Sequence, residues 1–161
     1  MVLVPECVAV VDLPVVAAGG IASGDQWAAA MALGAEGVQI GSRFAVTVES
    51  SGHDDFKRRV VEAGFGDTML ALKKHVPVRL LRNAFYEEIA ALEAAGAGRE
   101  ELAGVLGEGR ARRGMLEGDL EAGELEIGQV SGMIDDVPTV AELMTRLQAQ
   151  FADAAARLGS S

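Results

Sequence analysis

Two short apolar runs, each stopped by glycine, stand out in the first third of the chain. Residues 14–18 read PVVAA and are followed by Gly19 and Gly20, and residues 37–40 read GVQI and are followed by Gly41. Continuous apolar runs of this length, bounded by turn residues, are typical of strands that are buried on both faces. The pattern therefore predicts two buried strands that both end in glycine.

The segment between these runs has the features of a helix. Ser23 is a helix N-cap residue, and Gln26, three residues later, completes a capping box. Alanine is frequent in residues 27–33, and Gly34 follows as a stop signal. Residues 14–44 thus predict a strand, a helix and a strand. Such a βαβ unit has parallel strands and a right-handed connection.

After Val48 the pattern becomes mainly helical. Residues 53–63 place Phe56, Val60 and Ala63 on one helical face, and residues 67–74 are expected to form a turn or another helix. The residue before a proline avoids the α region, so Val76 and its neighbours should be extended. Three further helices are expected at residues 83–95, 99–106 and, within a glycine-rich loop, 110–116.

The two ends of the chain give weaker signals. Thr139 and Glu142 form a second capping box before a last helix, and residues 159–161 (Gly-Ser-Ser) are expected to fray. Residues 1–11 fit a short helix or the end of a strand equally well. The last helix carries apolar residues at helical spacing, namely Val140, Leu143, Met144, Leu147 and Phe151.

Composition narrows the classes of partner. The chain has 161 residues and a formal net charge of −10, which argues against nucleic acid or an anionic membrane as the main partner. Cys7 is the single cysteine, so an internal disulfide and a cysteine-rich zinc site are excluded. No stretch has the roughly 18 uncharged apolar residues that a membrane span needs. We expect a cytoplasmic protein without a metal site.

The glycines that end the two strands are the strongest chemical signal. Ligands bind at the carboxyl ends of parallel strands, and glycine there lets backbone N–H groups approach an anion. A helix that starts after Gly41 would add its free N–H groups. In (β/α)₈ barrels the loops after strands seven and eight build such a phosphate site. Glycine after a strand is also an ordinary turn device, but the pair AAGGI and QIGSRF favours phosphate binding.

Several segments resemble the nitronate monooxygenase (2-nitropropane dioxygenase-like) family, which also includes the flavin-dependent enoyl-acyl-carrier-protein reductases. The resemblance implies an α/β fold: the C-terminal part of an FMN-binding TIM (β/α)₈ barrel. Residues 1–48 would hold strands seven and eight, and residues 49–161 would form a mainly helical C-terminal region packed on the barrel. The matching segments are LVPECV (3–8), PVVAAGGIASG (14–24), ALGAEGVQIGSRF (32–44), PVRLLRNAF (77–85) and RGMLEGDLEAGELEIGQVSGMI (113–134).

The same resemblance implies the residues that bind FMN. Two lie in the loop after strand seven and four at the end of strand eight, and they would hold the FMN phosphate through backbone N–H groups and the Ser42 hydroxyl. No residue of this chain is implied to be catalytic, since the family's catalytic histidine loop would precede Met1. The implied cofactor-binding residues are Gly19, Gly20, Gln39, Ile40, Gly41 and Ser42.

The resemblance leaves several functions open. The first is the FMN phosphate-binding portion of an oxidoreductase, weak or inactive alone. The second is a fragment or subunit that completes a barrel with a separate N-terminal chain, and the third is a phosphate-binding module. An intact relative would use NAD(P)H and a nitronate or an enoyl substrate. The two parallel strands would leave apolar edges open, which also predicts self-association.

Other polar residues have structural interpretations. Arg43 is expected to pair with an acidic residue at the barrel rim rather than with the phosphate. Arg79 and Arg82 are expected to form salt bridges and Asn83 to cap a helix, with contact to a nicotinamide or acyl substrate as the alternative. His53 fits a helix N-terminus. The acidic residues between 117 and 136 predict a solvated face, and Gln129 is a weaker candidate for contact with the active site.

Overall fold

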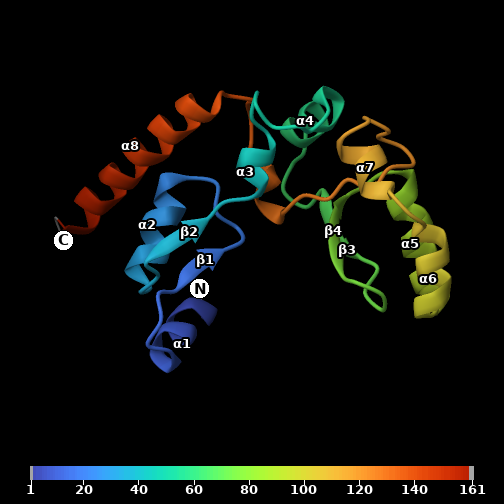
Figure 1. The fold of residues 1–161 in the computed structure, drawn as a ribbon, viewed down its shortest axis with the longest axis horizontal. Helices are drawn as coiled ribbons and strands as arrows, with labels where there is room; N and C mark the ends of the chain where they lie inside the picture. Colours follow the sequence, from blue (N-terminus) through green and yellow to red (C-terminus); the bar gives the residue numbers. More distant parts are fainter. Residues whose placement is uncertain (1, 160–161) are drawn as a thin grey trace.

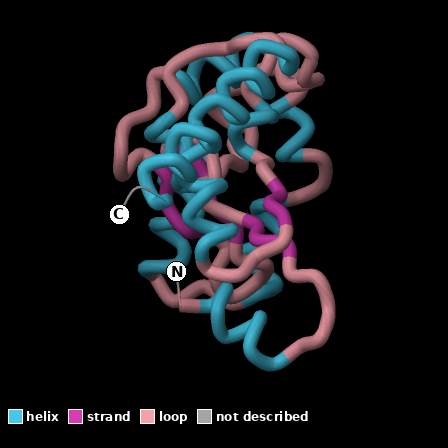
Figure 2. Tube along the Cα trace, turned by 90° about the vertical axis from the view of Figure 1, so that its left-hand side faces the viewer, coloured by secondary structure: helices cyan, strands magenta, loops and turns pink. Residues whose placement is uncertain are grey.

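The computed structural model describes residues 2–159, and it divides into two lobes on either side of a short helix, α3 (Figure 1). We call residues 2–48 together with 139–159 the first lobe, and residues 52–137 the second lobe. Helices and loops dominate, and the strands are short (Figure 2). The elements are α1 (Leu3–Val10), β1 (Val16–Ala18), α2 (Gly24–Ala32), β2 (Gly37–Gln39), α3 (Ser42–Ala45), α4 (Asp54–Val61), β3 (Thr68–Ala71), β4 (Val78–Leu81), α5 (Ala84–Ala94), α6 (Arg99–Leu106), α7 (Arg110–Met115), the 3₁₀ helix η1 (Gln129–Met133) and α8 (Val140–Gly159).

The first lobe contains the predicted βαβ unit. Strands β1 and β2 are parallel, with Ala17 paired to Val38, so their carboxyl ends lie side by side. The Ser23–Gln26 capping box starts α2 as predicted, and Gly34 follows its end with φ +98°, a conformation that favours glycine. A small buried cluster joins the strands to α2. The fold of this unit therefore follows from local signals.

The last helix returns to the first lobe. Helix α8 lies along α2 (Figure 1), and the N–H of Gly24 donates a 2.9 Å hydrogen bond to Oε1 of Gln150. The rings of Trp27 and Phe151 lie 4.6 Å apart between centroids. A Cβ on Gly24 would lie 2.3 Å from the carbonyl oxygen of Leu147, so only glycine permits this approach. The predicted capping box at the start of α8 is present, because Glu142 and Thr139 exchange hydrogen bonds. The predicted fraying of Ser160 and Ser161 lies outside the described residues.

The second lobe differs from the mainly helical expectation, because residues 67–74 hold strand β3 and a turn at residues 73–74 but no helix. Strands β3 and β4 make an antiparallel hairpin, with Leu70 opposite Arg79. Met69 and Leu70 are good helix formers, but pairing with β4 decides their conformation. Residues 125–127 extend this sheet: Leu81 N–H donates to the Leu125 carbonyl at 3.0 Å. One buried cluster lies on each face of the hairpin.

The contact between α2 and α8 gives a first prediction. Gly24→Ala would force these helices apart and lower the free energy of unfolding by about 2 kcal/mol, the usual cost of overpacking. Denaturant unfolding would measure it. Gly104→Ala is the control: Gly104 lies inside α6, where a Cβ would meet no atom within 4 Å, so alanine should leave stability unchanged or raise it. Equal losses in both variants would contradict the close approach.

Candidate functional site

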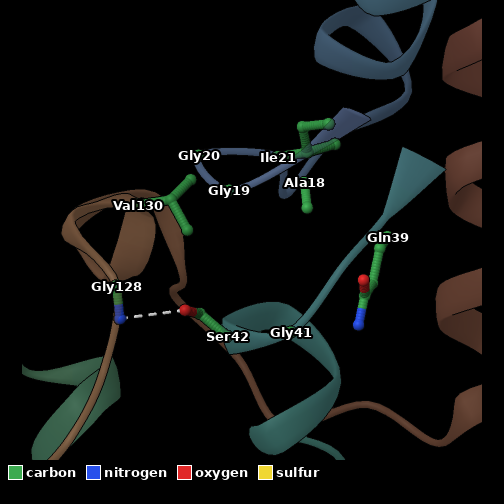
Figure 3. Close-up of a pocket in the computed structure, with 9 residues that line it drawn as sticks. All are labelled: Ala18, Gly19, Gly20, Ile21, Gln39, Gly41, Ser42, Gly128 and Val130. Atoms are coloured by element: carbon green, nitrogen blue, oxygen red, sulfur yellow. Dashed lines mark hydrogen bonds between the residues drawn. The ribbon is translucent and has the colours of Figure 1, made fainter. Parts of the chain in front are cut away.

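An open cleft of about 260 Å³ lies where β1 and β2 end. Figure 3 shows the loop after β1 on one side of the cleft and the start of α3 on the other. The carboxyl ends of parallel strands meet here, as the βαβ unit requires. The lining residues come from three segments that are far apart in the sequence: Ala18, Gly19, Gly20, Ile21, Gln39, Gly41, Ser42, Gly128 and Val130.

Five of the six residues proposed from the sequence line this cleft. They are Gly19, Gly20, Gln39, Gly41 and Ser42. Ile40 does not; it packs against the apolar cluster of the first lobe. This difference follows from the side-chain alternation of a strand, which turns successive residues to opposite faces. The structure thus brings the two glycine-ended segments together, and their role toward a phosphate stays a prediction.

Two glycines after β1 are required by the backbone. Gly19 and Gly20 have φ +94° and +71°, values that other residues rarely adopt. A Cβ on Gly19, Gly20 or Gly41 would meet no protein atom within 4 Å, so glycine leaves open space along the cleft. No lining side chain is charged. An anion in this cleft would therefore be held by backbone N–H groups and by hydroxyl or amide groups.

Ser42 connects the cleft to the second lobe. Its Oγ accepts a 3.0 Å hydrogen bond from the N–H of Gly128, drawn in Figure 3. A Cβ on Gly128 would lie 2.7 Å from that oxygen, so glycine is needed for the approach. The Ser42 hydroxyl can still donate its proton to a ligand oxygen. The sequence suggested the loop around Gly128, but Val130 contributes to the cleft wall where Gln129 was the candidate.

Arg43, the next residue, faces away from the cleft and confirms the predicted ion pair. Its side chain is only 4% exposed and pairs with Asp136, while Nη1 donates to the carbonyl oxygens of Val46 and Asp136. Arg146 of α8 donates to the other carboxylate oxygen of Asp136 at 2.7 Å. The hydrogen bond from Arg146 and the charge of Arg43 hold the pKa of Asp136 below its ordinary value. These contacts join α3, the segment before α8, and α8.

The other polar residues divide between confirmed and wrong expectations. Asn83 caps α5, since its side chain accepts from the N–H of Tyr86. His53 caps α4 through a 3.2 Å bond from the N–H of Asp55. The salt bridges expected for Arg79 and Arg82 are absent among residues 2–159: Arg79 donates to Thr68, and Arg82 lies over the ring of Tyr86.

The acidic segment 117–136 is only partly a solvated face. Glu124 is buried, with 5% of its surface exposed, and this burial together with the charge of Glu126 raises the pKa of Glu124 to about 7. Arg110 opposes the shift. No local pattern predicts this burial, which accompanies a close approach between Gly114 and the Glu124 backbone. Glu124 does not line the cleft.

Residues 2–159 contain neither a metal-ligand cluster nor a candidate membrane-spanning helix. Within residues 2–159, no group of three or more His, Cys, Asp or Glu side chains is placed to hold a metal ion. No helix in the same range combines the length and the apolar character that crossing a membrane would need.

Comparison with known proteins gives one family. The nitronate monooxygenase family model matches residues 1–150. A CoA dehydrogenase of Mycobacterium tuberculosis, named for its 5-hydroxy-7a-methyl-1-oxo-octahydro-1H-indene-4-carboxyl-CoA substrate, is 31% identical over 86% of this chain and 50% of its own length. A probable nitronate monooxygenase of Bacillus subtilis is 43% identical over 44% of this chain and 20% of its own length.

Solved structures agree with this result. FabK from Thermotoga maritima superimposes with a TM-score of 0.91 and 38% identity, covering 99% of this chain and 50% of that one. The nitroalkane oxidase of Streptomyces ansochromogenes superimposes with a TM-score of 0.78 and 31% identity, covering 98% of this chain and 44% of that one. These relatives match most of this chain, but the chain spans only about half of their length. They share an α/β fold with it.

The contacts of Asp136 give a prediction with a defined pH dependence. Asp136→Asn would leave the Arg43 charge buried without its counter-charge and lower the free energy of unfolding at pH 7 by about 2 kcal/mol. Because the folded pKa is lowered, the carboxylate stabilises the fold above its unfolded pKa, and this contribution is lost as the pH falls through the folded value.

The measurement is urea unfolding at several pH values. The difference from the wild type should be full at pH 7 and shrink below about pH 4. Asp135→Asn is the control, because this substitution removes the same charge one residue away, at an exposed position. If both variants lose the same stability at pH 7, Asp136 does not act through its contacts.

Proposed function

Because the chain belongs to the nitronate monooxygenase family, we propose that its glycine-lined cleft binds the phosphate group of FMN in a flavin-dependent oxidoreductase. The family is flavin-dependent, which supports a flavin as the cofactor. FMN carries a single terminal phosphate. The cleft at the ends of β1 and β2 supplies the kind of site that such a group requires.

The observation that carries the proposal is the meeting of two glycine segments at one edge of a parallel sheet. Gly19 and Gly20 come from one strand end and Gly41 from the other, and all three leave open space. Phosphate oxygens can therefore reach backbone N–H groups that side chains would otherwise cover. Ser42 adds a hydroxyl donor, and Gln39 adds an amide. These groups fit a phosphate without any charged side chain.

The size of the cleft suggests that it holds part of the cofactor. Its volume of about 260 Å³ lies below the roughly 300–1,000 Å³ of ordinary small-molecule sites. The phosphate and the adjoining polyol chain would lie here. Val130 and Ile21 give the cleft an apolar rim, which suits the path toward a flat ring.

The architecture supports a place near the end of a barrel. We propose that β1 and β2 are strands seven and eight of a (β/α)₈ barrel, because phosphate sites of such barrels form in the loops after these strands. Strand β1 pairs only with β2 among the described residues, and its outward Val16 is 57% exposed. A barrel neighbour would cover this residue.

The chain's own chemical role is binding. Bound FMN would accept and pass on electrons. None of the nine lining residues has a side chain that titrates near neutral pH, so the cleft contains no group for proton transfer. We propose a nitronate or an enoyl thioester as the substrate of the whole enzyme, with NAD(P)H as the electron donor where a reductase is concerned. The carboxyl-CoA dehydrogenase among the relatives favours a thioester.

The test is a titration of the purified chain with FMN, followed by quenching of flavin fluorescence. We expect saturable binding at micromolar FMN and a loss of at least about tenfold in affinity for Gly41→Val. Gly41 has φ −97°, so valine is tolerated by the backbone while its side chain enters the cleft. Gly98→Val is the matched control. Gly98 also precedes a helix and has open space around it, but it does not line the cleft.

The two variants separate the possible results. Binding that is weakened by Gly41→Val and kept by Gly98→Val supports the cleft as the phosphate site. Binding that both variants keep would place FMN elsewhere, and no binding by the wild-type chain would contradict autonomous cofactor binding.

A second function is favoured by the surface of α1 and β1. Large apolar residues are exposed there, and parallel strands with open edges invite pairing. We propose that this surface packs against further βα units of the barrel, on a complementary N-terminal chain or segment. The exposed residues are Val2, Leu3, Val10, Leu13 and Val16.

Sedimentation tests this second proposal. The wild-type chain should self-associate at micromolar concentration, because its apolar surface lacks a barrel partner. Leu13→Lys with Val16→Lys should shift the chain toward monomer. A double lysine variant at two other exposed positions, Leu116 and Leu158, should leave the association unchanged. A monodisperse wild-type monomer would contradict the proposal.

A further inference from the structure

A second hollow adjoins the cleft on the side of the second lobe. It is an open groove of about 450 Å³ between α3, the end of α7 and strand β4. The groove and the cleft share Gly41, Ser42 and Gly128, so the Ser42–Gly128 hydrogen bond forms the boundary between them. A ligand in the groove would therefore lie next to a ligand in the cleft.

Arg79 is the cationic residue of this groove. Leu70 and Arg79 are opposite each other in the hairpin, and Arg79 faces Ile127 across the added segment. Glu126 also lines the groove, where it pairs with Leu80 in an antiparallel bridge. The Glu126 carboxylate forms no ion pair with Arg79, because no carboxylate oxygen among the described residues lies within 4.0 Å of the guanidinium.

The guanidinium of Arg79 keeps donors for a ligand. Its Nη1 donates to the carbonyl oxygen of Thr68 at 2.9 Å and to Oγ1 at 3.2 Å. Within residues 2–159, no carboxylate lies within 4.0 Å of this group, although the chain carries a net charge of −10. Thr68 thus fixes one arm of a planar fork whose other N–H groups match the oxygens of a phosphate.

The remaining wall of the groove is apolar. Ala45, Met115 and Ile127 lie along it. An inorganic ion would leave this surface bare, whereas an organic phosphate would cover it with the group that carries the phosphate. The volume falls within the range of ordinary small-molecule sites.

We propose that this groove is a second anion site, in which Arg79 binds the phosphate of an organic phosphate other than FMN. The proposal rests on the proposed function and deepens it, by assigning the second ligand of the flavin site to a chemical class. Nucleotide-bearing electron donors and coenzyme A thioesters share an adenosine diphosphate unit, which supplies both the phosphate and a flat group for the apolar wall.

The experiment is a calorimetric titration of the chain with ADP, in the presence and absence of saturating FMN. We expect saturable ADP binding in both conditions. Arg79→Met should weaken it by about tenfold or more, the effect of losing a charge-assisted phosphate contact. Arg82→Met is the matched control: Arg82 lies three residues further along the same hairpin segment, is exposed, and faces Tyr86. It should bind ADP like the wild type.

A variant of the cleft separates this proposal from the first one. Ala18 lines the cleft but not the groove, and Ala18→Glu places a negative charge where the FMN phosphate would lie. This variant should lose FMN binding and keep ADP binding, while Arg79→Met should do the reverse. If the wild type fails to bind FMN but binds ADP through Arg79, the proposed FMN site is wrong and the proposed anion site in the groove is supported. ADP binding lost in Ala18→Glu would place ADP in the cleft and overturn the groove.

Two further readouts cover the remaining results. Arg79→Lys keeps the charge, so if Arg79→Met does not fold, Arg79→Lys should fold and bind ADP at an intermediate affinity. Amide signals of Ile127 and Gly128 in the wild type should shift on ADP addition, and those of Gly19 and Gly20 should not.

NADH, NADPH and coenzyme A are then tested as competitors of ADP, and the tightest competitor identifies the source of the adenosine diphosphate unit. No ADP binding, or equal losses in Arg79→Met and Arg82→Met, would overturn the proposal.

Discussion

The chain enters and leaves the second lobe beside the four-residue helix α3, and two side chains of α3 hold the entering and leaving segments together at this junction. Ser42 accepts the N–H of Gly128 where the chain returns from the hairpin, and Arg43 pairs with Asp136 where the chain leaves for α8. The two residues are adjacent, so their side chains leave the backbone in different directions, one toward the cleft and one toward the core. The cleft depends on this junction, because Gly128 and Val130 reach it only while the return segment is held.

The same junction explains why a neutral cleft can exist in an acidic chain. Arg43 is the nearest arginine in sequence to the cleft, yet its charge is used by Asp136, which Arg146 also binds. What remains at the cleft is glycine backbone, a serine hydroxyl and an amide. Backbone N–H groups bind phosphate without paying the desolvation cost of a buried cation. Arg79, which has no carboxylate partner among the described residues, lies beyond the Ser42–Gly128 boundary.

The parts of the fold that the sequence predicted are those decided within a few residues. The capping boxes at Ser23 and Thr139, the cap at Asn83 and the glycine-ended strands are local patterns. The hairpin of β3 and β4 was missed because Met69 and Leu70 favour a helix, and only pairing with a strand some ten residues away overrides that preference. The burial of Glu124 and the part of Val130 in the cleft likewise depend on contacts between distant segments. Of the site, the residues after each strand could be predicted directly. The loop around Gly128 was suggested only through Gln129, and the part of Val130 in the cleft wall could not be predicted.

The first lobe has a sheet of only two strands, and only one face of this sheet is covered. One face of the β1–β2 pair is covered by α2, which in turn is covered by α8. The other face carries Val16 and Ala18 outward, and β1 has no second neighbour among the described residues. Closing the sheet into a barrel would cover Val16 and leave Ala18, at the carboxyl end of its strand, beside the cleft. The apolar surface of the first lobe and the position of the cleft are then two consequences of one geometry, since a barrel buries its strands and opens its site at their carboxyl ends.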